Sequence, residues 1–198
     1  MQNLNYPVNF VFNIGTLAND FTATDASGRE VAYVRQKMFK LKEDILIYSD
    51  QSRSRVEYRI KADRWIDFSA AYSMFDDHGY EFGKIVRKGW ASIWKASYEI
   101  IDQHEQSQYR INEENPWVKV VDSILGDIPV IGFLTGYLFN PAYLLTNNRG
   151  EVLIKLKKIP SFFGRRFEIE QLGAINSDDE PRIILGLMMM LLLERRRG

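Results

Sequence analysis

The chain has 198 residues, 45% of them hydrophobic and 26% charged, so it is long enough to bury a core and has an ordinary globular composition. Lysine and arginine (26) balance aspartate and glutamate (26), which leaves no overall positive charge for binding nucleic acid. The absence of cysteine excludes disulfides, cysteine nucleophiles, Cys-ligated zinc and palmitoylation, and two histidines are too few for a histidine-rich metal site.

Short runs rich in β-branched and aromatic residues make up most of the chain. The first run, over 7–15, alternates Val8, Phe10 and Phe12 with other residues, which predicts a strand with one buried face. Strands as short and as regularly spaced as these predict a closed or sandwiched antiparallel sheet. Similar runs occupy residues 29–37, 42–50, 54–62, 65–75, 80–88, 92–102, 107–112, 151–158 and 165–173.

Three connections share a glycine turn followed by a strand that ends in basic residues. They read DASGREVAYVRQK from Asp25, DDHGYEFGKIVRK from Asp76 and NNRGEVLIKLKK from Asn147. Two explanations of this similarity remain open, an internal repeat and the general similarity of hairpins. Asp76, Asp77 and His78 could be imagined as a metal or acid–base cluster, but their position before a glycine predicts a turn.

The segment 117–145 is more apolar, and longer, than a turn requires. Apolar residues at helical spacing predict one or two short helices, each too short to span a bilayer. This insertion could cover the protein, contact a partner or another copy of the chain, or lie in a membrane interface. The residues that we expect to make a partner or membrane contact are Trp117, Phe133, Tyr137 and Phe139.

The last predicted element is a helix over 179–194. Its apolar run from Ile183 to Leu193 would be about 16 Å long, whereas a membrane span needs roughly 17 to 25 apolar residues. Because the run is apolar on every face, we expect the helix to lie inside the protein. Asp178 and Asp179 suit a helix start, and Gly186 indicates a close neighbour. An antiparallel sheet closed around this helix would bury it on all sides.

Four segments resemble, in this order, segments of the tubby C-terminal-like superfamily, and within it the LURF-one-related and phospholipid-scramblase-like branch. The segments are YVRQKMFKLKEDILIYSD (33–50), GYEFGKIVRKGW (79–90), RRFEIEQ (165–171) and the terminal DDEPRIILGLMMMLLLE. The resemblance implies one mainly β domain over 1–198, a barrel of about twelve antiparallel strands around a hydrophobic C-terminal helix. The cysteine cluster and spaced calcium loop of scramblase-type proteins are missing, so palmitoylation and calcium-driven scrambling are not expected.

Basic residues alternate with apolar ones along several predicted strands, which predicts that they lie on the outer face of the barrel. Tubby domains bind phosphoinositides through basic residues on the barrel exterior, so the resemblance implies a headgroup site among such residues. The candidates are Lys37, Lys40, Arg59, Lys61, Lys84, Arg87 and Lys88.

No phosphate loop, nucleophile elbow or metal-binding helix motif is present in the sequence. We therefore expect a non-enzymatic binding or scaffolding module without cofactor or metal, which binds anionic phospholipid or phosphoinositide at a membrane surface. The alternative is a protein-interaction or structural module that uses the insertion 117–145 and has no lipid role. No signal peptide or transmembrane span is evident, so the expected location is cytoplasmic, with peripheral association at the membrane.

Overall fold

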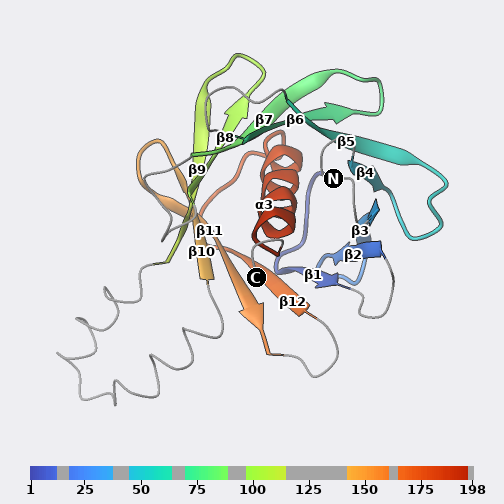
Figure 1. The fold of residues 1–198 in the computed structure, drawn as a ribbon. Helices are drawn as coiled ribbons and strands as arrows, with labels where there is room; N and C mark the ends of the chain where they lie inside the picture. Colours follow the sequence, from blue (N-terminus) through green and yellow to red (C-terminus); the bar gives the residue numbers. More distant parts are fainter. Residues whose placement is uncertain are drawn as a thin grey trace.

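The computed structural model describes residues 1–12, 18–37, 45–63, 70–88, 97–114, 142–160 and 165–195. Within them the chain forms a closed antiparallel barrel around one helix (Figure 1). Each strand pairs with its neighbours in the sequence, and β1 pairs with β12 to close the barrel. The predicted mainly β fold with about twelve strands is therefore confirmed. The strands are β1 (Val8–Phe12), β2 (Ala18–Thr24), β3 (Glu30–Lys37), β4 (Ile45–Tyr48), β5 (Val56–Ala62), β6 (Ala70–Asp76), β7 (Glu81–Arg87), β8 (Ser97–Asp102), β9 (Ser107–Glu113), β10 (Ala142–Asn147), β11 (Val152–Ile159) and β12 (Arg165–Gln171).

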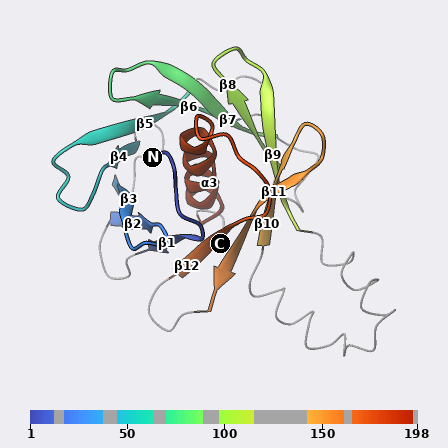
Figure 2. The same cartoon turned by 180° about the vertical axis from the view of Figure 1, so that it is seen from behind.

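The helix, α3 (Glu180–Arg195), lies along the inside of the barrel, as Figures 1 and 2 show from opposite sides. Eight strands already leave an interior that side chains alone can fill, so twelve strands enclose room for a helix about 10 Å wide. Each large apolar side chain buried here stabilises the fold by roughly 1.5–3 kcal/mol relative to an exposed one. Apolar helix side chains that are at most 4% exposed are Ile183, Ile184, Leu185, Leu187, Met188, Met189, Met190, Leu191 and Leu192.

Gly186 faces β8 across a narrow gap. A Cβ atom at this position would lie 2.7 Å from Cδ1 and 3.1 Å from Cγ1 of Ile100. The close neighbour that the glycine indicates in the sequence is therefore present, and it is an isoleucine side chain of the barrel wall.

At one end of the barrel, short hairpins join the strands; we call this the hairpin end (residues 25–29, 49–55, 77–80, 103–106 and 148–151). The Asp25 carboxylate accepts hydrogen bonds from the backbone N–H groups of Ser27 (3.0 Å) and Arg29 (3.1 Å). Asp76 and Asn147 make the same two contacts, to the residues two and four positions further on. The glycine of each turn has a φ between 80° and 83°, which favours glycine. Shared hairpin geometry thus accounts for the similarity between the three segments, and Asp76–His78 forms a turn as predicted.

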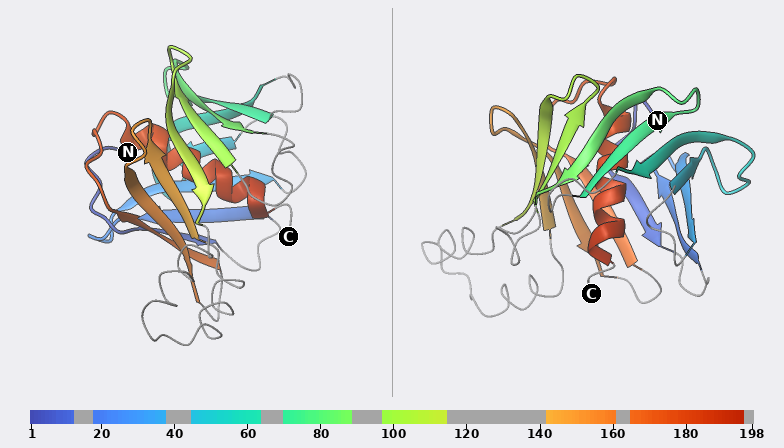
Figure 3. Two further views of the ribbon diagram at one scale, coloured as in Figure 1. Left: turned by 90° about the vertical axis from the view of Figure 1, so that its left-hand side faces the viewer. Right: turned by 45° about the horizontal axis from the view of Figure 1, so that its top comes forward.

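Polar contacts close the hairpin end over the start of the helix. The backbone N–H of Leu4 donates to the Glu180 carboxylate at 3.3 Å. The buried Arg182 donates to the carbonyl of Phe82 at 3.0 Å and pairs with Asp179 at 2.9 Å. These contacts fix the helix N-terminus inside the barrel, so the helix ends at the opposite end (Figure 3).

Most of the predicted insertion 117–145 lies outside the described residues, and so do Trp117, Phe133, Tyr137 and Phe139. Its last residues, from Ala142 to Leu145, belong to β10 and are extended, so the predicted helix does not reach them. For these four residues the prediction was wrong. They pair with both β9 and β11, and this pairing determines their conformation.

Candidate functional site

The outer bases of β7 form ion pairs with neighbouring carboxylates. Lys84 lies 2.6 Å from Glu105 and 3.7 Å from Glu81, and Lys88 lies 3.0 Å from Glu99. The hydrogen bond that Lys84 donates to the Glu105 carboxylate raises the pKa of Lys84, so this lysine stays charged. Ion pairs of this kind keep the outer face polar and stabilise the fold little, by roughly 0–1 kcal/mol each.

Two of the predicted headgroup residues, Arg59 and Lys61, lie together on the outer face of β5. They line a shallow hollow of about 330 Å³, in which the Lys61 ammonium sits 5.2 Å from the centre of the Phe75 ring. Asp76 and Asp77 line the same hollow. Both charge signs therefore meet in it, which weakens its attraction for an anion.

Arg87 is on the inner face of the barrel, so its predicted outer position is wrong. Ile85, two residues earlier on the same strand, is fully buried, and the period of two places Arg87 on the same inner side. Its Nε is buried and has no hydrogen-bond partner among the described residues. Of the other candidates, the Lys37 side chain and all of Lys40 lie outside the described part of the chain.

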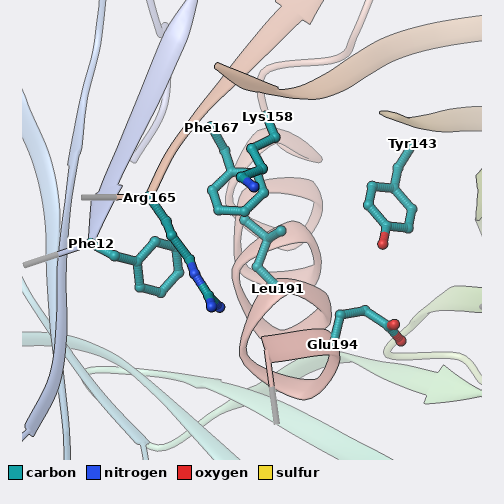
Figure 4. A pocket seen from close by; sticks show the side chains of 7 residues that line it. All are labelled: Phe12, Tyr143, Lys158, Arg165, Phe167, Leu191 and Glu194. Atoms are coloured by element: carbon teal, nitrogen blue, oxygen red, sulfur yellow. The ribbon is translucent and has the colours of Figure 1, made fainter. Parts of the chain in front are cut away.

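A pocket of about 280 Å³ opens where β1, β11 and the helix end; we call this the pocket end of the barrel. One wall of the pocket is apolar and is formed by Phe12, Phe167 and Leu191 (Figure 4). The rings of Phe12 and Phe167 make an edge contact with their centroids 5.8 Å apart. The described residues that line it are Phe12, Tyr143, Lys158, Arg165, Phe167, Leu191 and Glu194.

Two basic residues join this apolar wall from the paired strands β11 and β12. Lys158 follows the fully buried Leu156 by two positions, and Arg165 precedes the inward Phe167 by two, so both share the inner face. The register aligns Lys158 with Phe167 and Arg165 with Phe12. Both bases therefore lie beside aromatic rings, on the inner face rather than on the outer face that their alternation predicts.

Arg165 is exposed at the rim of the pocket, whereas Phe12 and Leu191 are only 2% and 4% exposed. Figure 4 shows its guanidinium beside the Phe12 ring and reaching toward the last turn of the helix. Its side chain makes no hydrogen bond or ion pair within the part of the chain that the structure describes. A positive group thus stands at the entrance to an apolar interior.

The opposite wall is acidic. Glu194 points toward Tyr143 and away from Arg165 (Figure 4). The buried Tyr98 hydroxyl donates a hydrogen bond to the Glu194 carboxylate. Burial, followed by this contact, raises the pKa of Tyr98 well above its usual range, so the phenol remains a donor at neutral pH. The pocket therefore has its bases and apolar side chains on one wall and a carboxylate on the opposite wall.

The described residues that line this pocket carry three kinds of polar group. They are two cations, one carboxylate and the phenol of Tyr143. No group of three or more potential metal ligands occurs in the described ranges. The arrangement can hold a ligand that is both apolar and negatively charged.

Sequence reasoning missed the pocket because its lining comes from five separate elements. One signal was available: counting in steps of two from the apolar residues Leu156 and Phe167 places Lys158 and Arg165 with the core. This count can be made only when the buried apolar residues are known. The alternation of basic and apolar residues along these strands instead predicted that the bases lie on the outer face.

Comparison of the chain with protein-family models, with curated proteins and with solved structures found no match. Among the described residues, no helix combines the length and the apolar character needed to cross a bilayer.

Proposed function

We propose that this protein is a non-enzymatic binding module for anionic lipid at a membrane surface, and that the pocket end is its binding site. The observation that carries the proposal is the inward position of Lys158 and Arg165 beside the apolar wall of Phe12, Phe167 and Leu191. Lipids combine these two properties, an anionic group and an apolar chain. The resemblance to the tubby-like superfamily supports a lipid-binding role.

The two bases suit a phosphate or carboxylate. Lysine and arginine both supply multiple donors, and arginine can bind two oxygens at once. Next to apolar side chains such contacts are screened less than on an open surface.

The outer face is a weaker candidate. Lys84 and Lys88 are paired with carboxylates, and the hollow of Arg59 and Lys61 contains two aspartates. An anion at either place would have to compete with groups of the same sign. Among the described residues that line the pocket, Glu194 is the one carboxylate, and it lies on the wall opposite Arg165.

Flotation of the purified protein with neutral and anionic vesicles, at low and physiological salt, tests the proposal. Salt-sensitive binding to anionic vesicles alone is expected, because salt screens the charge-driven part of binding. The double substitution Lys158→Gln with Arg165→Gln should abolish this binding. The matched control, Lys157→Gln with Arg166→Gln, removes the same charge from the outer face of the same two strands and should retain it.

No binding to either vesicle would overturn the proposal and favour a module for a protein partner. Equal losses in the two double variants would show that net charge, and not the pocket, drives the binding. Circular dichroism and a thermal melt of each variant would show that the comparison is made between folded proteins.

A further inference from the structure

We infer that the pocket takes one acyl chain, with the anionic group of the same molecule on Lys158 and Arg165. The ligand class is a single-chain anionic amphiphile, such as a fatty acid or a monoacyl phosphate. This inference rests on the proposed function of the pocket and specifies what enters it.

The volume limits the ligand to one chain. Small-molecule sites usually occupy about 300–1,000 Å³, and this pocket has about 280 Å³. A single water needs roughly 10–15 Å³ on this scale, so the pocket has room for about twenty waters. That space suits one acyl chain but not both chains of a phospholipid.

The burial of the lining sets the direction of the chain. Phe12 and Leu191 are almost completely buried, and the Phe12 ring continues into the core through Phe21, whose ring centroid lies 4.8 Å away. Arg165 is exposed at the rim. Methylene groups therefore belong against the aromatic wall, and the charged group belongs at the entrance, where it can keep part of its hydration.

The acidic wall restricts the charge of the ligand. Glu194 is held in place by the Tyr98 hydroxyl and lies on the side away from Arg165. A headgroup with several negative charges would bring some of them toward Glu194 and be repelled. One compact anionic group can contact the two bases without approaching that carboxylate.

Titration calorimetry with the full chain tests the inference, using saturated fatty acids of increasing length, at concentrations where they are monomeric. The matched probes are the alcohols of the same lengths and acetate. Affinity should rise about fourfold for each added methylene, the factor that corresponds to ~0.8 kcal/mol, until the chain fills the pocket. The alcohols should bind at least tenfold more weakly, and acetate should not bind measurably.

Two variants change the pocket in different ways. Lys158→Gln with Arg165→Gln should lower the affinity for fatty acids at least tenfold and leave the alcohols unchanged. Leu191→Phe adds bulk to the apolar wall, so it should shorten the longest chain that still gains affinity. The outer-face control, Lys157→Gln with Arg166→Gln, should bind as the unmodified protein does.

Affinity that does not depend on chain length, or that neither pocket variant changes, would overturn the inference. Binding to anionic vesicles without binding of monomeric fatty acids would refute the acyl-chain inference and leave the membrane-surface function standing. Binding of fatty acids without binding of vesicles would refute the membrane-surface function and retain the pocket as an acyl-chain site.

Discussion

The hydroxyl of Tyr98 on β8 donates a hydrogen bond to the carboxylate of Glu194 in the last turn of α3. The two residues are 96 positions apart in the sequence, so this bond joins the end of the helix to the barrel wall. Tyr98 is fully buried in the barrel, and Glu194 is one of the residues that line the pocket. One contact therefore supports both the packing of the helix and the acidic wall of the candidate site.

Replacing Tyr98 with phenylalanine removes this hydrogen bond without removing the ring. Because Glu194 can still reach water through the pocket, we expect the free energy of unfolding to fall by only about 1–2 kcal/mol. Urea unfolding at neutral pH measures the change. Tyr80→Phe is the control, since Tyr80 is 60% exposed and should change stability by less than about 0.5 kcal/mol. Equal losses in both variants would contradict a stabilising role for the Tyr98 bond.

Buried phenols predict a loss of stability in alkali. Burial is the main cause that raises the pKa of Tyr6, Tyr98 and Tyr109, and it raises the pKa of Tyr58 to about 12. A tyrosine in the unfolded chain ionises near pH ~10. The folded state thus holds protons that the unfolded state releases, so stability is complete below about pH 10 and falls as pH rises through about 12.

Urea unfolding at about pH 8, 10 and 11 should show this decline, and phenolate absorbance should rise together with the loss of tertiary structure. Ionisation of all the tyrosines near pH ~10 without unfolding would show that the phenols are not buried.

The hairpin that begins at Asp25 predicts a loss of stability in acid. The Ser27 hydroxyl, followed by the backbone N–H groups of Arg29 and Ser27 and the charge of Arg29, lowers the pKa of Asp25 to about 2. The resulting stability is present above about pH 4 and is lost as pH falls toward about 2. Asp25→Asn should therefore lower the free energy of unfolding by on the order of 1–2 kcal/mol at neutral pH.

Chemical unfolding of this variant and of the unmodified protein, from neutral pH to about pH 2, should show the difference shrinking toward zero. Asp178→Asn is the control, because the Asp178 carboxylate is exposed and accepts no hydrogen bond within the described residues. A difference for Asp25→Asn that stays constant over this range would exclude the ionised carboxylate as its cause.

The fold was predictable because two features of the sequence, the short strand-like runs and the apolar C-terminal run, indicate the same barrel. Ten of the twelve strands follow runs of β-branched and aromatic residues, and the helix Glu180–Arg195 differs from the predicted 179–194 by one residue at each end. The strand β2 (Ala18–Thr24) was missed because ANDFTAT has few strong strand formers. It pairs with β1 and β3, and these tertiary contacts decide its conformation.

The site was not predictable to the same degree. Lys158 and Lys157 are adjacent and chemically identical, but the first faces the pocket and the second forms ion pairs with Glu168 and Glu170 on the outer face. Only the register of the whole barrel separates them, because a shift by one residue exchanges the two faces of a strand. Phe12 and Leu191 likewise meet only after the barrel has closed.

The burial of the helix predicts that a charge within it prevents folding. Leu187 is 1% exposed, and an aspartate at this position would have no partner for its charge. The cost of about 3–5 kcal/mol or more is comparable to the total stability of a small domain, about 5–15 kcal/mol. Leu187→Asp should therefore remove the cooperative thermal transition and elute as an aggregate in size-exclusion chromatography, and Met189→Asp should do the same.

Leu172→Asp is the matched control, since the same substitution falls on a leucine that is 56% exposed just after β12. It should unfold cooperatively, with a stability within about 0.5 kcal/mol of the unmodified protein. A monomeric Leu187→Asp protein with a sharp melting transition would mean that the helix can leave the barrel while the strands stay closed. Because the helix fills the interior and Glu194 forms part of the pocket, such a result would also remove the basis for the acidic wall.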